Sequence, residues 1–359
     1  MAEPTAVRHT APTQVQGPRG PRFGDYTGLT PRLQPPGAEG LPGRRHLTGF
    51  LRHKRWMYTF AANDEILVTA AIVDAGPTGT AFLTVADRRT GHLLADVSRP
   101  GGTRPMVSVN DRPGEGHRSR YRMPGTDVAM HTDDGILAVR ARVGSPIGLP
   151  AVGKPSIELD LAFDITAQPA LTVISDLDTQ PRSVSTTGKN AGLPVSGRVL
   201  IRHAGLLHAF DFSDGIGGFD YTSGFLPRHT HWRWAYLTGL LADGRIVGVN
   251  MSADFSGLVG RARENSVWLD GELHAIDPDA TISYHPEAPE QPWHVRTADG
   301  AVDLEFTPIG VHRESLNLGV VRSRFLQPVG EFRGTLALAG QTVSLDGLPG
   351  VVENQDVLW

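Results

Sequence analysis

Aromatic and ionisable side chains are concentrated in one short segment, residues 220–236. If the part after Pro227 is a β-strand, its successive side chains point to opposite faces. One face then carries His229, His231 and Arg233, and the other carries Trp232, Trp234 and Tyr236. The segment therefore predicts a cavity in which an apolar ligand lies beside titratable groups, and either face could be the inner one.

Asp220 is the candidate acid of this segment. Acid-catalysed chemistry on an alkene needs a carboxylic acid that stays protonated near neutral pH, and burial among aromatic side chains favours that form. The faces of Trp232, Trp234 and Tyr236 would stabilise positive charge that develops on the substrate. An equally open alternative is that Asp220 caps a turn before Gly224 and that the aromatic residues only fill a core.

His229 and His231 could complete a proton relay with Asp220, because imidazole titrates near neutral pH. The same spacing occurs in metal sites of β-barrels, but such a site needs a third ligand. The spacing singles out no third ligand, although three side chains are available: Glu353, His208 and His294. A pair of this kind is more often an exposed or hydrogen-bonded strand edge, so we predict no metal.

Two further charged residues are candidates for ligand binding. Lys189, next to Asn190, could reach a ligand carboxylate or stabilise an enolate, although a solvated loop lysine is the more common case. Residues 350–359 resemble a last strand, which would place Glu353 and Gln355 on one face and close a barrel. A buried Glu353 would need a partner, and Arg233 or His231 could supply it.

The elements that must position these residues are β-strands. Residues 156–165 alternate between apolar and polar side chains, which predicts a strand with one wet face. A further hairpin is expected from residues 80–85 and 93–97. Asp-Gly pairs typical of two-residue hairpin turns stand at 134–135, 243–244, 270–271 and 299–300. Helical periodicity is scarce, and residues 182–194 are the best candidate for a crossover between two halves.

Composition excludes several function classes. The net charge of -4, from 34 basic and 38 acidic residues, gives no basic surface for nucleic acid or a membrane. The absence of cysteine excludes disulfides, thiolate metal sites and cysteine nucleophiles. No dinucleotide-binding or phosphate-binding glycine motif and no serine-hydrolase elbow is present, so we expect a cofactor-independent protein. Without a signal peptide or a long apolar run, we expect a soluble, cytoplasmic protein of open oligomeric state.

Several stretches of the sequence resemble the family called domain of unknown function 2804. They are residues 55–58, 189–194 with Gly197, 220–234, 246–250 and 327–334. That family is in turn similar to the lipocalin-like hydroxyneurosporene synthase group, which contains carotenoid 1,2-hydratases. The shared element is Asp220, Gly224, Trp232 and Trp234, while residues 221–223 differ from the hydratase spelling. The resemblance implies two calycin-like barrels packed together.

We therefore predict an all-β protein of two consecutive lipocalin-like antiparallel β-barrels or half-barrels, with few helices. Residues 1–45 would form an extended or partly disordered arm, 46–190 a first domain, and 191–359 a second domain with the main site. The predicted function is binding of an apolar small molecule, isoprenoid or polyketide-like, with acid-assisted hydration, dehydration or cyclisation. The alternatives are a hydrophobic-ligand carrier and a metal-dependent enzyme that uses His229 and His231.

Overall fold

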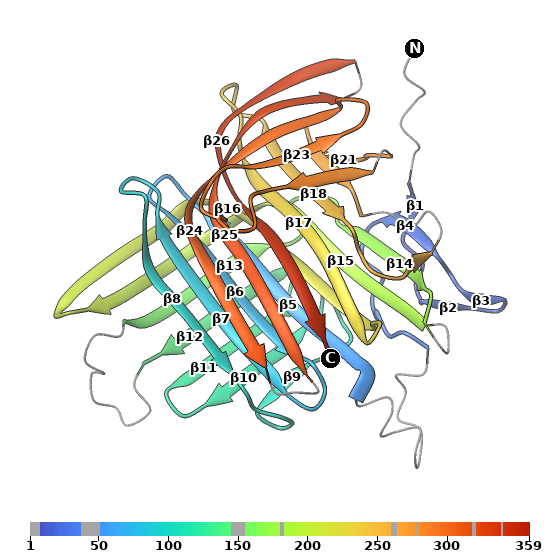
Figure 1. The fold of residues 1–359 in the computed structure, drawn as a ribbon, viewed down its shortest axis with the longest axis horizontal. Coiled ribbons are helices and arrows are strands. Elements are labelled where there is room, and N and C mark those ends of the chain that lie inside the picture. The colour runs from blue at the N-terminus through green and yellow to red at the C-terminus, as the bar shows by residue number, and fades with distance from the viewer. Residues whose placement is uncertain are drawn as a thin grey trace.

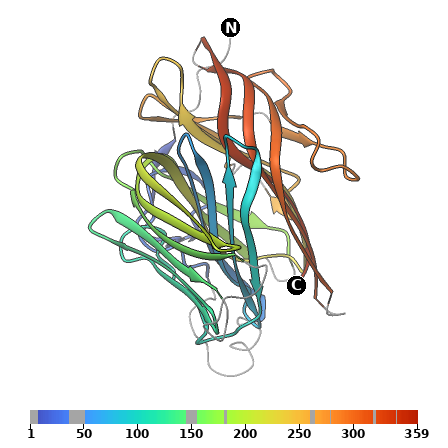
Figure 2. The same cartoon turned by 90° about the vertical axis from the view of Figure 1, so that its left-hand side faces the viewer.

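A computed structural model describes residues 8–36, 51–144, 155–179, 183–259, 264–277, 279–317, 321–338 and 340–359. Within these residues the chain forms two curled antiparallel sheets that pack side by side (Figures 1 and 2). The prediction of an all-β fold built from two consecutive half-barrels is confirmed. None of the helices in the described part is long and apolar enough to cross a membrane.

The first sheet runs from β8 at one edge to β9 at the other, and its strands are mostly joined by hairpins. Its main strands are β5 (His53–Ala62), β6 (Ile66–Asp74), β7 (Gly79–Asp87), β8 (His92–Pro100), β9 (Val107–Val109), β10 (Arg118–Met123), β11 (Thr126–Asp133), β12 (Ile136–Val143), β13 (Ser156–Asp164), β14 (Leu171–Leu177), β15 (Ser183–His203) and β16 (Leu206–Phe225). Strand β5 pairs with β16, so the beginning and the end of residues 53–225 lie side by side in the sheet.

The second sheet has β17 and β26 at its centre. Its strands are β17 (His229–Leu240), β18 (Ile246–Ala253), β20 (Ser266–Leu269), β21 (Glu272–Ala275), β22 (Ala280–Ser283), β23 (Trp293–Thr297), β24 (Val302–Asn317), β25 (Arg322–Leu338) and β26 (Gln341–Leu358). The C-terminal strand that the sequence predicts is therefore present. It pairs with both β17 and β25 in the middle of the sheet.

Local sequence patterns explain many of these strands. Strand β13 buries its alternate apolar side chains and exposes Glu158 and Asp160, as its period of two predicts. All four Asp-Gly pairs join antiparallel neighbours. At Asp134 and Asp270 the aspartate itself has positive φ, followed by glycine with positive φ, which is the backbone of a type I′ turn. The hairpin expected from residues 80–97 is β7–β8.

The predicted crossover at residues 182–194 is wrong. These residues, from Ser183 onward, lie in β15, which pairs with β14 on one side and β16 on the other. The polar and glycine-rich sequence is accommodated by a bulge between Ala191 and Leu193 rather than by a loop. The expected boundary between residues 190 and 191 thus falls inside β15, and the second sheet begins with β17.

The N-terminal segment packs on the first sheet where it is described. Strand β4 (Gly24–Thr27) pairs with β14, and β1 (His9–Thr10) pairs with β4. Strands β2 (Gln16–Gly17) and β3 (Gly20–Pro21) form a small hairpin of their own, and β19 (Leu258–Val259) also pairs with β14. Leu33 has no exposed surface. The arm predicted for residues 1–45 is therefore ordered between residues 8 and 36, and its other residues lie outside the described part.

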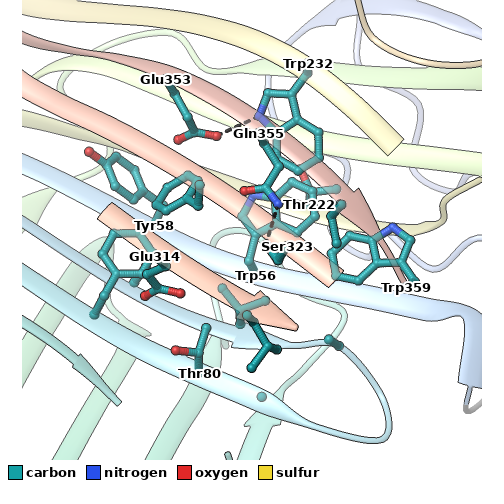
Figure 3. A pocket seen from close by; sticks show the side chains of 18 of the residues that line it. Trp56, Tyr58, Thr80, Thr222, Trp232, Glu314, Ser323, Glu353, Gln355 and Trp359 are labelled. Atoms are coloured by element: carbon teal, nitrogen blue, oxygen red, sulfur yellow. Dashed lines mark hydrogen bonds between the residues drawn. The ribbon is translucent and has the colours of Figure 1, made fainter. Parts of the chain in front are cut away.

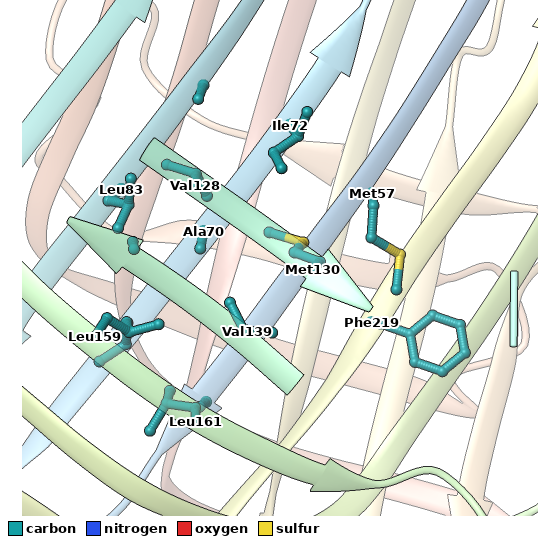
Figure 4. Close-up of a cluster of buried hydrophobic side chains, with 14 of the residues drawn as sticks. Met57, Ala70, Ile72, Leu83, Val128, Met130, Val139, Leu159, Leu161 and Phe219 are labelled. Carbon is teal, nitrogen blue, oxygen red and sulfur yellow. The ribbon is translucent and has the colours of Figure 1, made fainter. Parts of the chain in front are cut away.

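The interior of the first half-barrel is filled with apolar side chains. Met57, Ala70 and Leu83 of β5–β7 face Val128 and Val139 of β11 and β12 (Figure 4). A second core fills the other half-barrel, and a third lies in the seam between the two sheets. Because each half-barrel has a filled interior, space for a ligand must be sought at the seam.

Close approach of the two sheets depends on a glycine. A Cβ atom at Gly218 of β16 would lie 2.0 Å from Tyr236 Oη and 2.2 Å from Asn190 O. Tyr236 of β17 donates a 3.0 Å hydrogen bond to that same carbonyl of β15. The missing side chain therefore lets a tyrosine of the second sheet reach the backbone of the first.

Candidate functional site

A cavity of about 380 Å³ lies in the seam between the two sheets. Its wall takes side chains from β5, β6, β7, β8, β15 and β16 of the first sheet and from β17, β24, β25 and β26 of the second (Figure 3). The prediction assigned the main site to the second domain, with Lys189 as the one candidate from the first. The cavity instead belongs to both halves, because it exists only where their outer faces meet.

Strand β5 illustrates how the sequence builds this wall. Both faces of the strand are covered, and Met57 points into the first half-barrel while Trp56 and Tyr58 line the cavity. Strand β16 follows the same alternation, with Asp220 and Thr222 at the cavity. Strand β5 therefore carries apolar or aromatic residues on both faces, whereas β16 presents polar side chains to the cavity.

Aromatic rings form much of the cavity wall. The rings of Trp56 and Trp232, from opposite sheets, stack with centroids 5.9 Å apart, and Trp232 also stacks on Phe255 at 6.0 Å. Tyr58 meets Trp234 edge to face at 5.5 Å. The aromatic face of β17 is thus the one that looks into the cavity, and it offers ring faces to an apolar or cationic group.

Glu353 of β26 is the carboxyl group best suited to hold a proton. The residue is 7% exposed and lines the cavity. Its Oε1 accepts a 2.6 Å hydrogen bond from Trp232 Nε1, and its Oε2 accepts a 2.9 Å bond from Gln327 Nε2. Burial raises the pKa of Glu353 to about 7, and the two donors only partly oppose that effect. Near neutral pH this side chain is therefore divided between acid and carboxylate.

Asp220 has a different environment from the one predicted for it. Lys189 Nζ lies 3.0 Å from its Oδ1, and Trp56 Nε1 donates a 3.1 Å bond to Oδ2. Lys189 also lies 3.5 Å from Glu264 and over the ring of Trp234. Asp220 is thus paired with an ammonium group instead of lying among aromatic side chains alone, and Glu353 is the carboxyl group that has the predicted surroundings. Asp220 also lies within β16, not at a turn.

Lys189 is not a solvated loop residue. Its side chain is buried on β15, directly opposite Asp220 in the pairing with β16. Two carboxylates, those of Asp220 and Glu264, compete for its ammonium group. The ammonium group of Lys189 is therefore already ion-paired, and an anionic ligand group would have to displace one of these carboxylates to reach it.

His229, His231 and Arg233 lie on the face of β17 that points away from the cavity. His229 Nε2 lies 2.7 Å from Asp356 Oδ1, and His231 Nε2 lies 3.3 Å from Asn354 Oδ1. Arg233 donates to the Ile282 carbonyl and pairs with Asp254. A relay from Asp220 through either histidine has no geometric basis here, and neither His231 nor Arg233 partners Glu353.

The histidine pair also lacks the surroundings of a metal centre. Across the described ranges, no group of three or more His, Cys, Asp or Glu side chains is placed to hold a metal ion.

Tyr236, the third aromatic residue predicted for the site, is buried behind the cavity wall. Its ring stacks on Trp234 at 5.5 Å, and its hydroxyl binds the Asn190 carbonyl.

Sequence reasoning missed several cavity residues. Trp56 and Tyr58 of the cavity wall, and Gln327 that donates to Glu353, lie inside stretches that resemble the family, so those stretches pointed toward them without assigning a role. Glu264 and Glu314 had no local pattern to mark them. Their position at the cavity depends on pairing between strands that are distant in sequence.

The family model for the domain of unknown function DUF2804 matches residues 41–359, nearly the whole chain. The chain belongs to this family. The match agrees with the resemblance of its sequence motifs. No curated protein matches the chain.

Three solved structures show how far a likeness of fold extends for this DUF2804 member. Kievitone hydratase from Nectria haematococca is 10% identical, with 85% of this chain and 88% of that one covered and a TM-score of 0.44. A putative AttH from Nitrosomonas europaea is 14% identical, with 85% and 92% covered and a TM-score of 0.45. CghA with Sch210972 is 8% identical, with 86% and 88% covered and a TM-score of 0.40. At these TM-scores the likeness assigns no ligand or reaction to the chain.

Proposed function

We propose that this protein binds a largely apolar small molecule, isoprenoid or polyketide-like, in the seam cavity and protonates it. The observation that carries this proposal is the environment of Glu353. Its carboxyl group is buried in an aromatic cavity, and burial raises its pKa to about 7. A general acid works best when its pKa lies near the working pH. Maintaining a buried carboxyl group of this kind costs stability, and such costs are typical of functional sites.

The charges around the cavity favour a cationic intermediate over an anionic one. Lys189 is neutralised by Asp220 and Glu264, so it gives little stabilisation to an enolate or other oxyanion. Indole rings and nearby carboxylates stabilise positive charge instead. Trp56, Trp232 and Trp234 all line the cavity near Glu353.

The proposed step starts with transfer of the Glu353 proton to a carbon atom of an alkene in the ligand. The alkene π electrons form the new C–H bond, and the adjacent carbon becomes cationic. In hydration, water adds to that carbon and returns a proton to the Glu353 carboxylate. In cyclisation, a second alkene attacks the cation, and loss of a proton to Glu353 restores the acid. Dehydration is the reverse of hydration, and none of these steps needs a cofactor.

Solvent deuterium tests the proposal. The protein would be purified from its own host, its organic extract identified by mass spectrometry, and the extracted compound incubated with the protein in D₂O. Protonation at carbon places deuterium in a C–D bond, which mass spectrometry detects. Glu353→Gln should slow this incorporation at least about a hundredfold while binding persists. Glu305→Gln, which changes an exposed carboxylate of β24, is the matched control and should leave the rate unchanged.

A carrier function is the second candidate, because the aromatic wall would hold an apolar ligand without any proton transfer. A carrier would bind the extracted compound and incorporate no deuterium into it. Incorporation that is equal in the wild type and in Glu353→Gln would instead contradict the role of Glu353. If the extract is empty and the protein binds neither the probe farnesol nor its methyl ether, the binding proposal itself fails.

A further inference from the structure

A second polar group lies across the cavity from Glu353. Glu314 of β24 lines the cavity and lies on the other side of the Tyr58 ring in Figure 3. The strand register gives the separation of Glu353 and Glu314. Glu353 accepts a hydrogen bond from Gln327 of the neighbouring strand β25, and Gln327 is paired with His312 of β24, two residues before Glu314. Two strand spacings are about 10 Å and two residues along a strand about 7 Å, so the Cα atoms of the two glutamates are about 12 Å apart along the sheet.

Glu314 is held in place by the first sheet. Ser98 of β8 donates a short hydrogen bond to its Oε1, and His312 Nε2 lies 3.3 Å from that same oxygen. The other ring nitrogen of His312 lies 2.5 Å from Asp96 Oδ1. The His312 ring is almost completely buried and stacks on Phe82 with a centroid distance of 5.0 Å. Glu314 is therefore positioned through its Oε1 atom, and its Oε2 atom takes no part in these contacts.

One observation points to a polar group on the ligand at this position. Among the described residues, Glu314 Oε2 has no hydrogen-bond partner, and its side chain is 22% exposed toward the cavity it lines. Polar atoms in such a setting are expected to be satisfied by whatever fills the cavity.

We propose that Glu314 Oε2 accepts a hydrogen bond from a hydroxyl group of the ligand. This inference rests on the proposed function and narrows its substrate class. The ligand is then an elongated, mostly apolar alcohol whose hydroxyl group lies across the cavity from the bond that Glu353 protonates. A carboxylate accepts hydrogen bonds and cannot donate them, so it distinguishes an alcohol from the corresponding ether. Glu314 is in this scheme a specificity-determining residue and takes no part in proton transfer.

Farnesol and farnesyl methyl ether are matched probes for this proposal. They share one apolar chain and differ in a single hydrogen-bond donor. Binding can be followed through the fluorescence of the cavity tryptophans Trp56, Trp232 and Trp234. The wild type should bind farnesol about tenfold more tightly than the ether, as expected for one hydrogen bond to a charged acceptor. In Glu314→Leu this ratio should fall below about twofold, since the acceptor is gone.

The ratio is read within each protein, so a general loss of stability does not imitate the result. Glu305→Leu, a matched change at an exposed glutamate of the same strand, should keep the wild-type ratio. If Glu314→Leu folds poorly, Glu314→Gln replaces it as the test variant. It retains the bulk of the side chain and should give an intermediate ratio. Equal binding of both probes by the wild type overturns the role of Glu314 and leaves the proposed function standing. Binding of neither probe also overturns the role of Glu314, and together with an empty extract it overturns the proposed function as well.

Discussion

The indole N–H of Trp232 donates a 2.6 Å hydrogen bond to Oε1 of Glu353. The two residues lie on adjacent strands of the second sheet, and the same indole ring stacks on Trp56 of the first sheet. The contact thus joins the aromatic wall of the cavity to its acid. Burial sets the pKa of Glu353 high, and this hydrogen bond limits how high it rises. The aromatic wall of the cavity therefore influences the pKa of Glu353.

Trp232→Phe should raise the pKa of Glu353 above its value of about 7. The substitution keeps an aromatic ring but removes the N–H that stabilises the carboxylate. The carboxyl stretching band in infrared difference spectra measures the titration, and Glu353→Gln identifies the band by its loss. A titration midpoint that stays the same or falls in Trp232→Phe would contradict this account of the hydrogen bond.

The stability of the wild type relative to Glu353→Gln should depend on pH. Because the folded-state pKa of about 7 lies above the ordinary value of 4.5, the unfolded chain releases this proton first as the pH rises. The relative stability is therefore highest below pH 4.5, falls between pH 4.5 and 7, and levels off above that. The total change is about 3 kcal/mol. Urea unfolding of both proteins from pH 4 to 8 measures it, and a constant difference would show that Glu353 has no raised pKa.

His312 should be an imidazolium at neutral pH. Burial lowers its pKa, but hydrogen bonds to Asp96 and Glu314 outweigh burial and raise the pKa from 6.5 to about 9. Its contribution to stability is then complete below pH 6.5 and is lost as the pH rises through about 9. Asp96→Asn should lower the pKa of His312, and imidazole nitrogen shifts in NMR spectra report it. Asp160→Asn, at an exposed strand position, should leave the titration unchanged.

The fold could be predicted where one strand carries its own pattern. Strand β13 alternates because one of its faces meets water, and the Asp-Gly turns specify hairpins through their backbone conformations alone. Strand β15 could not be recognised in this way. Both of its edges are paired and most of its first half is buried, so its polar residues and glycines are satisfied by neighbouring strands rather than by a loop.

The candidate site shows the same limit. Sequence alone selected Asp220, Lys189, Glu353 and the tryptophans, but it could not pair them, because partners are separated by long stretches of chain. Asp220 receives its lysine through the register of β15 with β16. Glu353 receives Trp232 through the register of β26 with β17. These non-local contacts give the two carboxyl groups different surroundings, and no local pattern encodes them.

Lys189→Met should destabilise the protein by about 3 to 5 kcal/mol in urea unfolding, because Asp220 is left as a buried charge without its ammonium partner. The double variant Lys189→Met with Asp220→Asn should recover a large part of that loss, since the uncompensated charge is also removed. Arg140→Met, which breaks an exposed ion pair with Asp160, should cost less than about 1 kcal/mol. If the double variant is no more stable than Lys189→Met, the lysine acts through packing and not through its charge.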